Sequence, residues 1–155
     1  MSDTQLKTLE DGGEEKEFCV VSVESSQQSS VISTFPDGTA DKATDGDIST
    51  MSETAFEPAP WYSAELGGRF TAIRLNITQF SMGNTHHLTI YTLENGVETE
   101  CARHNEDELW RDRPWSAMCQ NAGTGFKISA VPKPYRTTTN MILQEITVEV
   151  QLSSI

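Results

Sequence analysis

The feature of this sequence that most constrains its fold is a series of short β-prone segments separated by turn signals. Residues 70–78 alternate apolar and polar side chains with the period of two that a half-buried strand shows. Further β-branched or alternating segments lie at residues 18–23, 61–66, 87–92, 125–131 and 141–150. No long stretch carries an apolar stripe at helical spacing. The pattern therefore predicts an all-β sandwich or barrel.

Turn-forming residues separate these segments. Pro36-Asp37-Gly38 is a turn signal, and Gly67-Gly68 is expected to close the segment that begins at Trp61. Glu94-Asn95-Gly96 follows a strand-like segment and predicts a hairpin turn. The Ser- and Gln-rich residues 25–30 are expected to form a loop.

The first residues differ in composition from the rest of the chain. Within residues 1–17, acidic side chains outnumber lysines, and Gly12-Gly13 disfavours a helix. This pattern predicts an acidic, flexible N-terminal arm followed by one domain over residues 18–155. A chain of 155 residues is long enough for one domain with a hydrophobic core of its own.

Net charge limits the partners. The chain has 11 Lys and Arg against 23 Asp and Glu, a formal net charge of −12. Such an excess repels phosphate groups, so neither nucleic acid nor an anionic membrane is an expected partner. Cations and neutral ligands fit better. No run of about 18 apolar residues is present that would span a membrane.

The three cysteines do not by themselves decide whether the chain lies in an oxidising or a reducing compartment. Cys101 and Cys119 lie 18 residues apart, and Cys19 is distant from both. A disulfide across such a loop would stabilise the fold by about 3 kcal/mol, but the spacing fits two reduced thiols equally well. Residues 1–4 lack the basic and apolar regions of a signal peptide. A cytosolic chain and a secreted chain whose signal peptide is absent here both stay open.

The order of several motifs resembles a known superfamily. These motifs are Ser29-Ser30, Ala43-Thr44-Asp45-Gly46-Asp47, Pro60-Trp61-Tyr62-Ser63-Ala64-Glu65-Leu66-Gly67, Ile73-Arg74-Leu75-Asn76-Ile77 and Leu143-Gln144-Glu145-Ile146-Thr147-Val148. In this order they resemble the discoidin (coagulation factor type C) superfamily over about residues 25–150. The ending and the paired cysteines before it are similar to those of the F-type lectins. The resemblance implies an eight-stranded, galactose-binding-like jelly-roll sandwich, whose loops at one end bind ligands. It also implies a Cys101–Cys119 disulfide and a secreted or extracellular location.

The fucose-binding signature of the F-type lectins is not intact. That signature places a His before R-x-D-x4-R, and the first Arg falls at Phe80, the Asp at Met82 and the second Arg near His87. Gly83-Asn84 replaces the vicinal cysteines of the same loop. Because the guanidinium pair that would hold sugar hydroxyls is missing, fucose specificity is not expected.

Other polar side chains in the same loops are candidates for binding a different sugar. The candidate ligand-binding residues are Gln79, His86, His87, Arg103, Trp110 and Arg111. A neutral imidazole both donates to and accepts from hydroxyls, and an exposed Trp can stack on a sugar ring. The alternative is that the histidines lie at the rim without a ligand. The Arg residues would then form a salt-bridged loop with its tryptophans in the core. The core is the expected place for Trp115, and the place of Trp110 is left open.

A structural Ca²⁺ ion is expected beside the last strand. Asp45 and Asp47 flank a glycine in a tight turn, where their charges repel unless a cation lies between them. The resemblance places this loop against the last strand, where Glu145 would complete the shell. Further candidate ligands are the carbonyls of Lys42 and Gln144 and the hydroxyl of Ser52 or Ser49. The alternative is a simple Asx turn at Asp45, with Asp47 in solvent.

Catalytic and zinc-binding patterns are absent from the sequence. His86, His87, Cys101, His104 and Cys119 do not show the spacing of a zinc site. Glu53 and Glu57 are more typical of a solvated loop than of a glycosidase pair, and no nucleophile or phosphate-binding motif is present. The chain is therefore not expected to be an enzyme.

Together the motifs predict a carbohydrate-binding module. Its ligand would be a glycan or a cell-surface glycoprotein, and a repeat within a larger protein or an oligomer would raise the modest affinity of one site. The rivals are an adhesion or receptor module that binds a protein through the same loops and a structural domain with no ligand. Asn76-Ile77-Thr78 is a sequon on a predicted strand, and whether it carries a glycan is left open.

Overall fold

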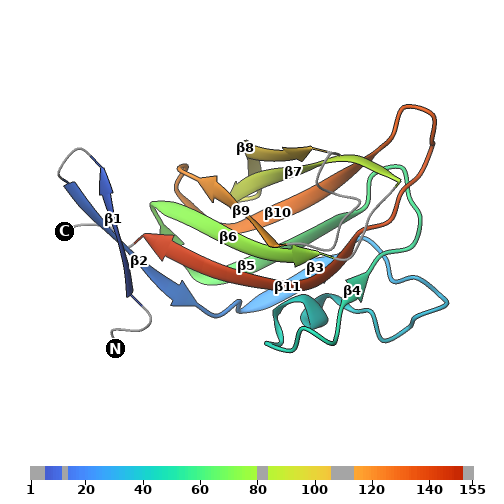
Figure 1. Cartoon of the computed structure of the whole chain (residues 1–155), viewed down its shortest axis with the longest axis horizontal. Helices are drawn as coiled ribbons and strands as arrows, with labels where there is room; N and C mark the ends of the chain where they lie inside the picture. Colours follow the sequence, from blue (N-terminus) through green and yellow to red (C-terminus); the bar gives the residue numbers. More distant parts are fainter. Residues whose placement is uncertain (1–5, 12–13, 80–83, 106–113, 152–155) are drawn as a thin grey trace.

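Two antiparallel β-sheets face each other in the computed structural model (Figure 1), which describes residues 6–11, 14–79, 84–105 and 114–151. The larger sheet has the order β1-β2-β11-β6-β9, and β4 also pairs with β11. Its strands are β1 (Leu6–Asp11), β2 (Glu14–Val21), β4 (Ser52–Glu53), β6 (Ala72–Gln79), β9 (Pro114–Cys119) and β11 (Ile142–Gln151). The second sheet has the order β3-β5-β10-β7-β8. Its strands are β3 (Ser25–Gln28), β5 (Trp61–Phe70), β7 (Thr85–Glu94), β8 (Val97–Asn105) and β10 (Gly123–Pro132).

The core lies between the inner faces of the two sheets. In β6, Ile73, Leu75 and Ile77 are fully buried, and Phe126 and Ile128 of β10 are buried in the opposite sheet. This is the period-two alternation that the sequence predicts for residues 70–78. The all-β sandwich is therefore confirmed. Eight strands, β2 and β5–β11, make up most of it, and the remaining strands β1, β3 and β4 extend its edges.

Several local predictions differ from the structure. Residues 25–28, expected in a loop, form β3 and pair with β5. Gly67-Gly68 does not end a strand, because β5 continues to Phe70 through an irregularity where the pairing with β10 shifts between Gly123 and Gly125. Gly67 has a φ of +77°, which glycine adopts at little cost.

The N-terminal residues also differ from the expected arm. Within the segment 1–17, residues 6–11 form β1 and residues 14–17 begin β2, and these strands pair with each other as a hairpin. This hairpin extends beyond the rest of the sandwich (Figure 1). Only the C-terminal part of β2, from Phe18, pairs with β11.

A disulfide joins the two sheets. Cys101 of β8 and Cys119 of β9 are bonded, with their Cα atoms 5.1 Å apart. The pairing implied by the family resemblance is thus confirmed. Cys19 is buried in β2 opposite Val150 and is not part of this bridge.

The helical content is small. Within the described residues the helix given by the structure is η2, a 3-10 helix over Ala40–Thr44. No helix in that part of the chain is both long and apolar enough to cross a membrane.

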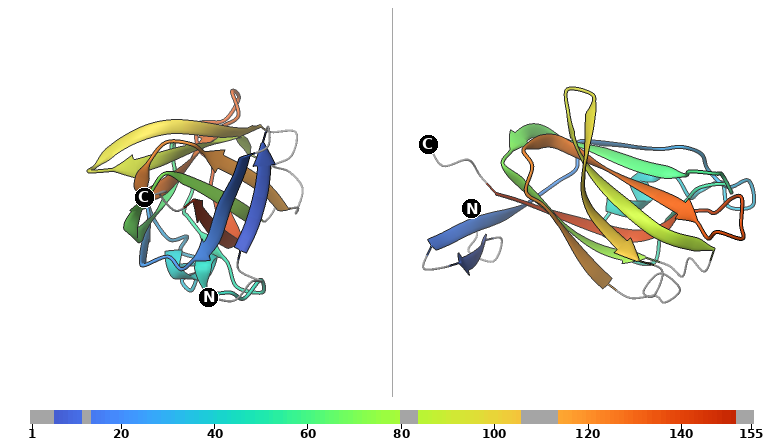
Figure 2. Two further views of the ribbon diagram at one scale, coloured as in Figure 1. Left: turned by 90° about the vertical axis from the view of Figure 1, so that its left-hand side faces the viewer. Right: turned by 90° about the horizontal axis from the view of Figure 1, so that it is seen from above.

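The two ends of the sandwich differ, and the right-hand view in Figure 2 shows loops and turns gathered at opposite ends of the strands. We call one end the loop end and define it by residues 54–60, Asn84 and residues 133–141. We call the other the hairpin end and define it by the turn at Asn95-Gly96 and the β9–β10 connection at residues 120–122.

Candidate functional site

Three connections meet at the loop end. The backbones of Glu57 and Thr139 exchange two hydrogen bonds of 2.9 Å, which joins the β4–β5 and β10–β11 connections. The N–H of Lys133 donates to the carbonyl of Asn84 at 3.1 Å, which adds the connection before β7. Inside, the hydroxyls of Thr85 and Thr139 lie 2.7 Å apart, and both residues are fully buried. The loops are therefore anchored to one another by paired polar groups.

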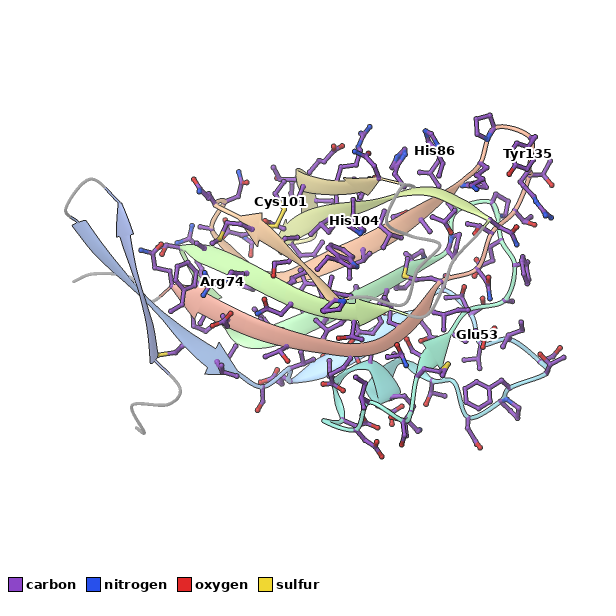
Figure 3. All side chains as sticks on the ribbon, viewed as in Figure 1. Glu53, Arg74, His86, Cys101, His104 and Tyr135 are labelled. Atoms are coloured by element: carbon purple, nitrogen blue, oxygen red, sulfur yellow. A yellow bond between two sulfur atoms is a disulfide. The ribbon has the colours of Figure 1, made fainter. Side chains whose placement is uncertain are left out.

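Two aromatic side chains are exposed on these anchored loops. Tyr135, on the β10–β11 connection, is 76% exposed, and Phe56, on the β4–β5 connection, is 51% exposed. Figure 3 shows Tyr135 at the outer edge of the loop end, with His86 on the same side of the molecule. An exposed aromatic ring on a fixed backbone is a stacking surface for a ligand. The sequence interpretation missed both residues. Their only signal was an aromatic side chain within Pro- and Thr-rich connections.

Carboxylates lie beneath this surface. Glu57 accepts hydrogen bonds from the hydroxyls of Ser29, at 2.7 Å, and of Ser30. Glu53 accepts from Asn140 Nδ2 at 3.0 Å, and burial raises its pKa although this hydrogen bond opposes the shift. The two carboxylates are therefore partly buried hydrogen-bond acceptors, whereas the sequence interpretation expected a solvated surface loop.

Three of the predicted ligand-binding residues come together at the start of β7. His86 and His87 have ring centroids 5.1 Å apart, and β7 pairs with β8, so that Thr89 lies opposite Arg103. Burial, with the positive charges of Arg103 and His86, lowers the pKa of His87. The His87 imidazole is therefore neutral at pH 7, which allows it to donate and to accept.

The other predicted ligand-binding residues lie partly or wholly outside the described part of the chain. Gln79 ends β6 at the loop end, but its side chain is outside the description. Trp110 and Arg111 lie outside the described residues, as do Phe80 and Met82, which the sequence interpretation compared with the fucose-binding signature. Trp115, expected in the core, is half-buried and packs against the core cluster.

The predicted cation loop lies against β11. The N–H of Gly46 donates to Glu145 Oε1 at 3.2 Å, which brings together two residues 99 positions apart. Burial raises the pKa of Glu145; the Gly46 hydrogen bond lowers it, and the charges of Asp45 and Asp47 raise it further. This crowding of negative charge is what a bound cation would relieve.

Oxygen atoms of the same loop surround the hydroxyl of Thr50. Its Oγ1 lies 3.4 Å, 2.9 Å and 2.5 Å, respectively, from the Lys42 carbonyl, the Asp47 carbonyl and Asp45 Oδ2. Carbonyl, hydroxyl and carboxylate oxygens are the donor types that calcium takes. The described residues contain no group of three or more His, Cys, Asp or Glu side chains placed to hold a metal. A cation here would therefore depend on backbone and hydroxyl oxygens.

Some of the expected cation ligands lie elsewhere. Ser52 is buried in β4 opposite Leu143, so the hydroxyl in the loop cluster belongs to Thr50, which the sequence interpretation missed. Asp45 Oδ1 accepts from the N–H of Asp47 at 3.0 Å, which is the Asx turn considered as the alternative, and the Asp47 carboxylate accepts from the N–H and hydroxyl of Ser49. Gln144 lies where the pairing of β11 with β6 shifts between Leu143 and Glu145.

The sequon is engaged by neighbouring strands. Asn76 Nδ2 donates to Glu149 Oε1 at 2.7 Å, and its Oδ1 accepts from the Ser116 hydroxyl at 2.7 Å. A glycan on Nδ2 would displace the hydrogen bond to a carboxylate that is 2% exposed.

Comparison with known proteins adds the fold family. Sequence comparison with protein families and with curated proteins finds no match. Among solved structures, the chain is similar to the family 32 carbohydrate-binding module of Clostridium perfringens NanJ, solved with galactose. The TM-score is 0.65 at 21% identity, and the match covers 81% of this chain and 92% of that one. A second similar structure is the family 32 module of AlyQ, solved with 4,5-unsaturated mannuronic acid, with a TM-score of 0.65 at 13% identity, covering 83% and 96%.

A third similar structure is chitosan-binding module 1 from a Paenibacillus chitosanase/glucanase, with a TM-score of 0.66 at 15% identity, covering 83% and 96%. The chain also matches 14% of the length of a C. perfringens family 89 glycoside hydrolase, at 20% identity. These likenesses show the fold, a jelly-roll sandwich of the kind found in carbohydrate-binding modules. At such low identity they do not by themselves assign a ligand.

Proposed function

We propose that this chain is a carbohydrate-binding module that recognises its glycan at the loop end. The observation that carries the proposal is Tyr135, which is 76% exposed on a loop whose backbone is held by Lys133 and Thr139. The fold of the chain is similar to that of modules solved with galactose and with an unsaturated mannuronic acid, and this similarity supports a sugar as the ligand class.

The chemistry of the surface suits a neutral sugar. An aromatic ring stacks on the apolar C–H face of a sugar, and neighbouring polar groups bind its hydroxyls. At pH 7 the neutral His87 both donates and accepts, and Arg103, 51% exposed, adds donors nearby. With a net charge of −12, the chain favours neutral over strongly anionic glycans.

The motifs indicate which sugar is not expected to bind. Within the proposed lectin-like role, the F-type lectin resemblance would predict fucose, but Phe80 and Met82 replace the charged residues of that motif. Two charge-assisted hydrogen bonds of about 1.5–3 kcal/mol each would be lost. We therefore expect fucose to bind at least hundreds-fold more weakly than it binds an intact motif. Saturation of the chain by micromolar fucose in calorimetry would contradict this expectation.

A glycan array followed by calorimetry on the best ligand tests the main proposal. Tyr135→Ala should weaken binding about tenfold, because an aromatic contact contributes about 1 kcal/mol. Val20→Ala is the control, since Val20 is an apolar side chain 40% exposed on β2, outside the loop end. If Tyr135→Ala leaves the affinity unchanged, the loop end is not the site.

The rival function is an adhesion module that binds a protein through the same loops. It predicts no binding to any free glycan, but capture of a protein partner that survives enzymatic removal of the partner's glycans. A protein partner that is lost after deglycosylation would instead support the carbohydrate proposal.

A structural calcium ion, held by the loop after η2, is part of the proposal. The supporting observation is the set of oxygens from Lys42, Asp45, Asp47, Thr50 and Glu145. Calcium at a hundredfold excess over its Kd would add about 2.7 kcal/mol to the free energy of unfolding. Asp45→Asn should remove this gain. Asp37→Asn, the same charge change in an exposed turn, should keep it. A melting temperature that calcium does not raise in the unaltered chain would end the calcium proposal.

The calcium proposal also has a pH signature. Because the pKa of Glu145 is raised in the folded chain, protons compete with calcium for this carboxylate. Calcium affinity should fall between pH 7 and about pH 5. Without calcium, the effect of pH on the free energy of unfolding has the opposite direction. Protonated Glu145 favours the folded state, and this contribution to stability is lost as the pH rises through the raised pKa. A calcium affinity independent of pH in this range would argue against Glu145 as a ligand.

We also propose that the chain works outside the cell. The Cys101–Cys119 disulfide supports this, because such bonds persist in oxidising compartments. Non-reducing peptide mapping of the protein from its native source should show the linked pair. Alkylatable thiols at both positions would contradict the proposed location.

A further inference from the structure

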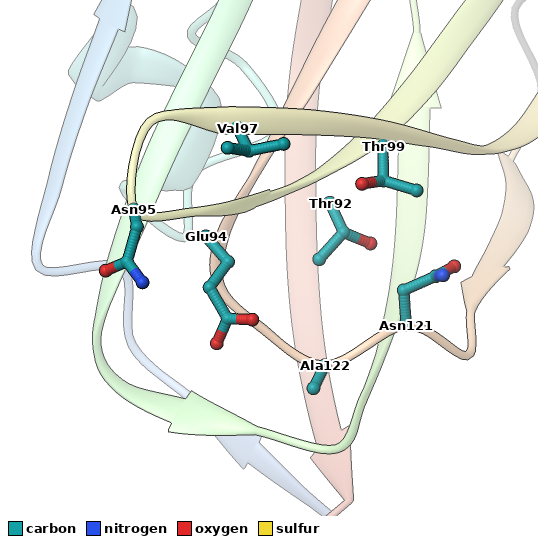
Figure 4. Close-up of a pocket in the computed structure, with 7 residues that line it drawn as sticks. All are labelled: Thr92, Glu94, Asn95, Val97, Thr99, Asn121 and Ala122. Atoms are coloured by element: carbon teal, nitrogen blue, oxygen red, sulfur yellow. The ribbon is translucent and has the colours of Figure 1, made fainter.

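A pocket at the hairpin end lies apart from the loop end. It has a volume of about 460 Å³ and lies between the tip of the β7–β8 hairpin and the β9–β10 connection, as Figure 4 shows. β7 contributes Thr92 and Glu94, and Asn95 lies in the hairpin turn. The opposite wall comes from Asn121 and Ala122. Binding pockets for small molecules fall in the same range of volume.

The strand register explains why the hairpin end is hollow. Thr92 pairs with Thr99, and Glu94 pairs with Val97, so these four side chains share the inward-facing side of the hairpin. In the opposite sheet, the edge strand β9 ends at Cys119, which is bonded to Cys101 of the hairpin. In the part of the chain that the structure describes, the inner side of the hairpin beyond Cys119 faces the β9–β10 connection.

The floor of this pocket is fixed by close backbone packing. A Cβ on Gly123 would lie 2.2 Å from Thr92 Cγ2 and 2.7 Å from the Leu93 carbonyl oxygen, so the position accepts only glycine. The absence of a side chain at Gly123 lets the start of β10 pack directly against Thr92. A wall held by such packing would lower the entropic cost of binding.

One polar group in the pocket lacks a partner. Thr92 is 2% exposed, and its hydroxyl makes no hydrogen bond within the described residues. A buried hydroxyl without a partner is unfavourable, and most such groups in proteins are satisfied by protein, water or a ligand. Figure 4 shows the Thr92 hydroxyl on the pocket side of β7, near Thr99 and Asn121.

The remaining polar groups indicate which ligand would fit. Two asparagine amides and the Thr99 hydroxyl each donate and accept, and the Glu94 carboxylate accepts. Hydrogen bonding to Arg69 lowers the pKa of Glu94, so this carboxylate is ionised at pH 7. Among the described residues that line the pocket there is no Lys or Arg, although Arg69 pairs with the Glu94 carboxylate. This chemistry disfavours anions and matches a neutral molecule with several hydroxyls.

We infer that the hairpin end holds a second binding site, for a neutral saccharide unit, with Thr92 at its floor. A chain with sites at both ends could bridge two glycan chains, which raises avidity without any change at either site. The inference does not depend on the loop end, because the lining residues of the two sites do not overlap.

Two-dimensional NMR titration of the backbone amides with neutral mono- and disaccharides (galactose, N-acetylglucosamine and mannose series) tests this inference. Amides of Thr92, Thr99 and Asn121 should shift with a binding curve of their own. Tyr135→Ala should leave that curve unchanged, so failure at the loop end is distinguished from failure here. If no neutral saccharide moves the hairpin-end amides, the second site is absent.

Thr92→Val provides a sharper test. It keeps the shape of the side chain but removes the hydroxyl, so hairpin-end binding should weaken about tenfold while loop-end binding is unchanged. The melting temperature of the free protein should stay the same or rise, because a buried hydroxyl without a partner is removed. A clear fall in melting temperature, or saccharide binding that is unaffected by Thr92→Val, would overturn the inference.

Discussion

The loop end and the hairpin end of one sandwich are built in opposite ways. At the hairpin end the backbone is tightly constrained: Asn95 and Gly96 adopt φ values of 52° and 76°, and Gly123 has no room for a Cβ. At the loop end, the connections carry the highly exposed side chains Phe56 and Tyr135 above anchors made of buried threonines and partly buried carboxylates. One sandwich can therefore fix the backbone at one end by tight turns and leave the loops at its other end free to vary for recognition.

The largest expected effect concerns the disulfide, which joins the sheets toward the hairpin end. The double change Cys101→Ser and Cys119→Ser should lower the free energy of unfolding by about 3 kcal/mol. Urea denaturation with linear extrapolation measures this. The unaltered chain under strong reducing agent should show a similar loss. A change below about 1 kcal/mol would mean that turn chemistry alone holds this end.

The second-largest effect is expected from glycine substitutions at the hairpin end, which distinguish lack of space for a side chain from an unfavourable backbone conformation. Gly123→Ala should cost about 2 kcal/mol, because the new methyl group meets Thr92 and the Leu93 carbonyl. Gly96→Ala is the matched control. A Cβ at Gly96 would meet nothing within 4 Å, so only its positive φ matters, at about 1 kcal/mol. Equal costs in urea denaturation would show that space is not what limits Gly123.

A smaller effect is expected from the anchors of the loop end. Thr139→Val leaves the Thr85 hydroxyl buried without its 2.7 Å partner and should cost about 1 kcal/mol. The double change Thr85→Val and Thr139→Val should cost less than the sum of the two single changes. Strict additivity in the double-mutant cycle would show that the two hydroxyls do not depend on each other.

The smallest effect is expected at the exposed surface itself. Tyr135→Ala and Phe56→Ala should change the free energy of unfolding by less than about 0.5 kcal/mol, because neither side chain is needed by the core. Thermal melting measures this directly. Destabilisation above about 1 kcal/mol would give these aromatic side chains a structural role and weaken the contrast between the two ends.

Part of the fold was predictable because it depends on local chemistry. The alternation in residues 70–78 predicts which side chains of β6 face the core, and Asn95-Gly96 predicts its hairpin. The spacing of Cys101 and Cys119 did not decide between a disulfide and two thiols, and the family resemblance was needed to favour the bond. Strand β8 escaped prediction because it is largely polar and exposed, so its sequence lacks the alternation of a half-buried strand.

The candidate sites show the same division. The acidic turn at Asp45-Gly46-Asp47 could be predicted from the sequence, since it depends on residue types at short spacing. Only the tertiary structure decided that Thr50 joins that turn, that Tyr135 is exposed on an anchored loop, and that Thr92 lies at the floor of a pocket. These are facts of burial and of contact between distant strands. Such contacts are set by how the two sheets pack, and the neighbours of Thr50, Tyr135 and Thr92 in the sequence do not specify which distant segments these residues meet.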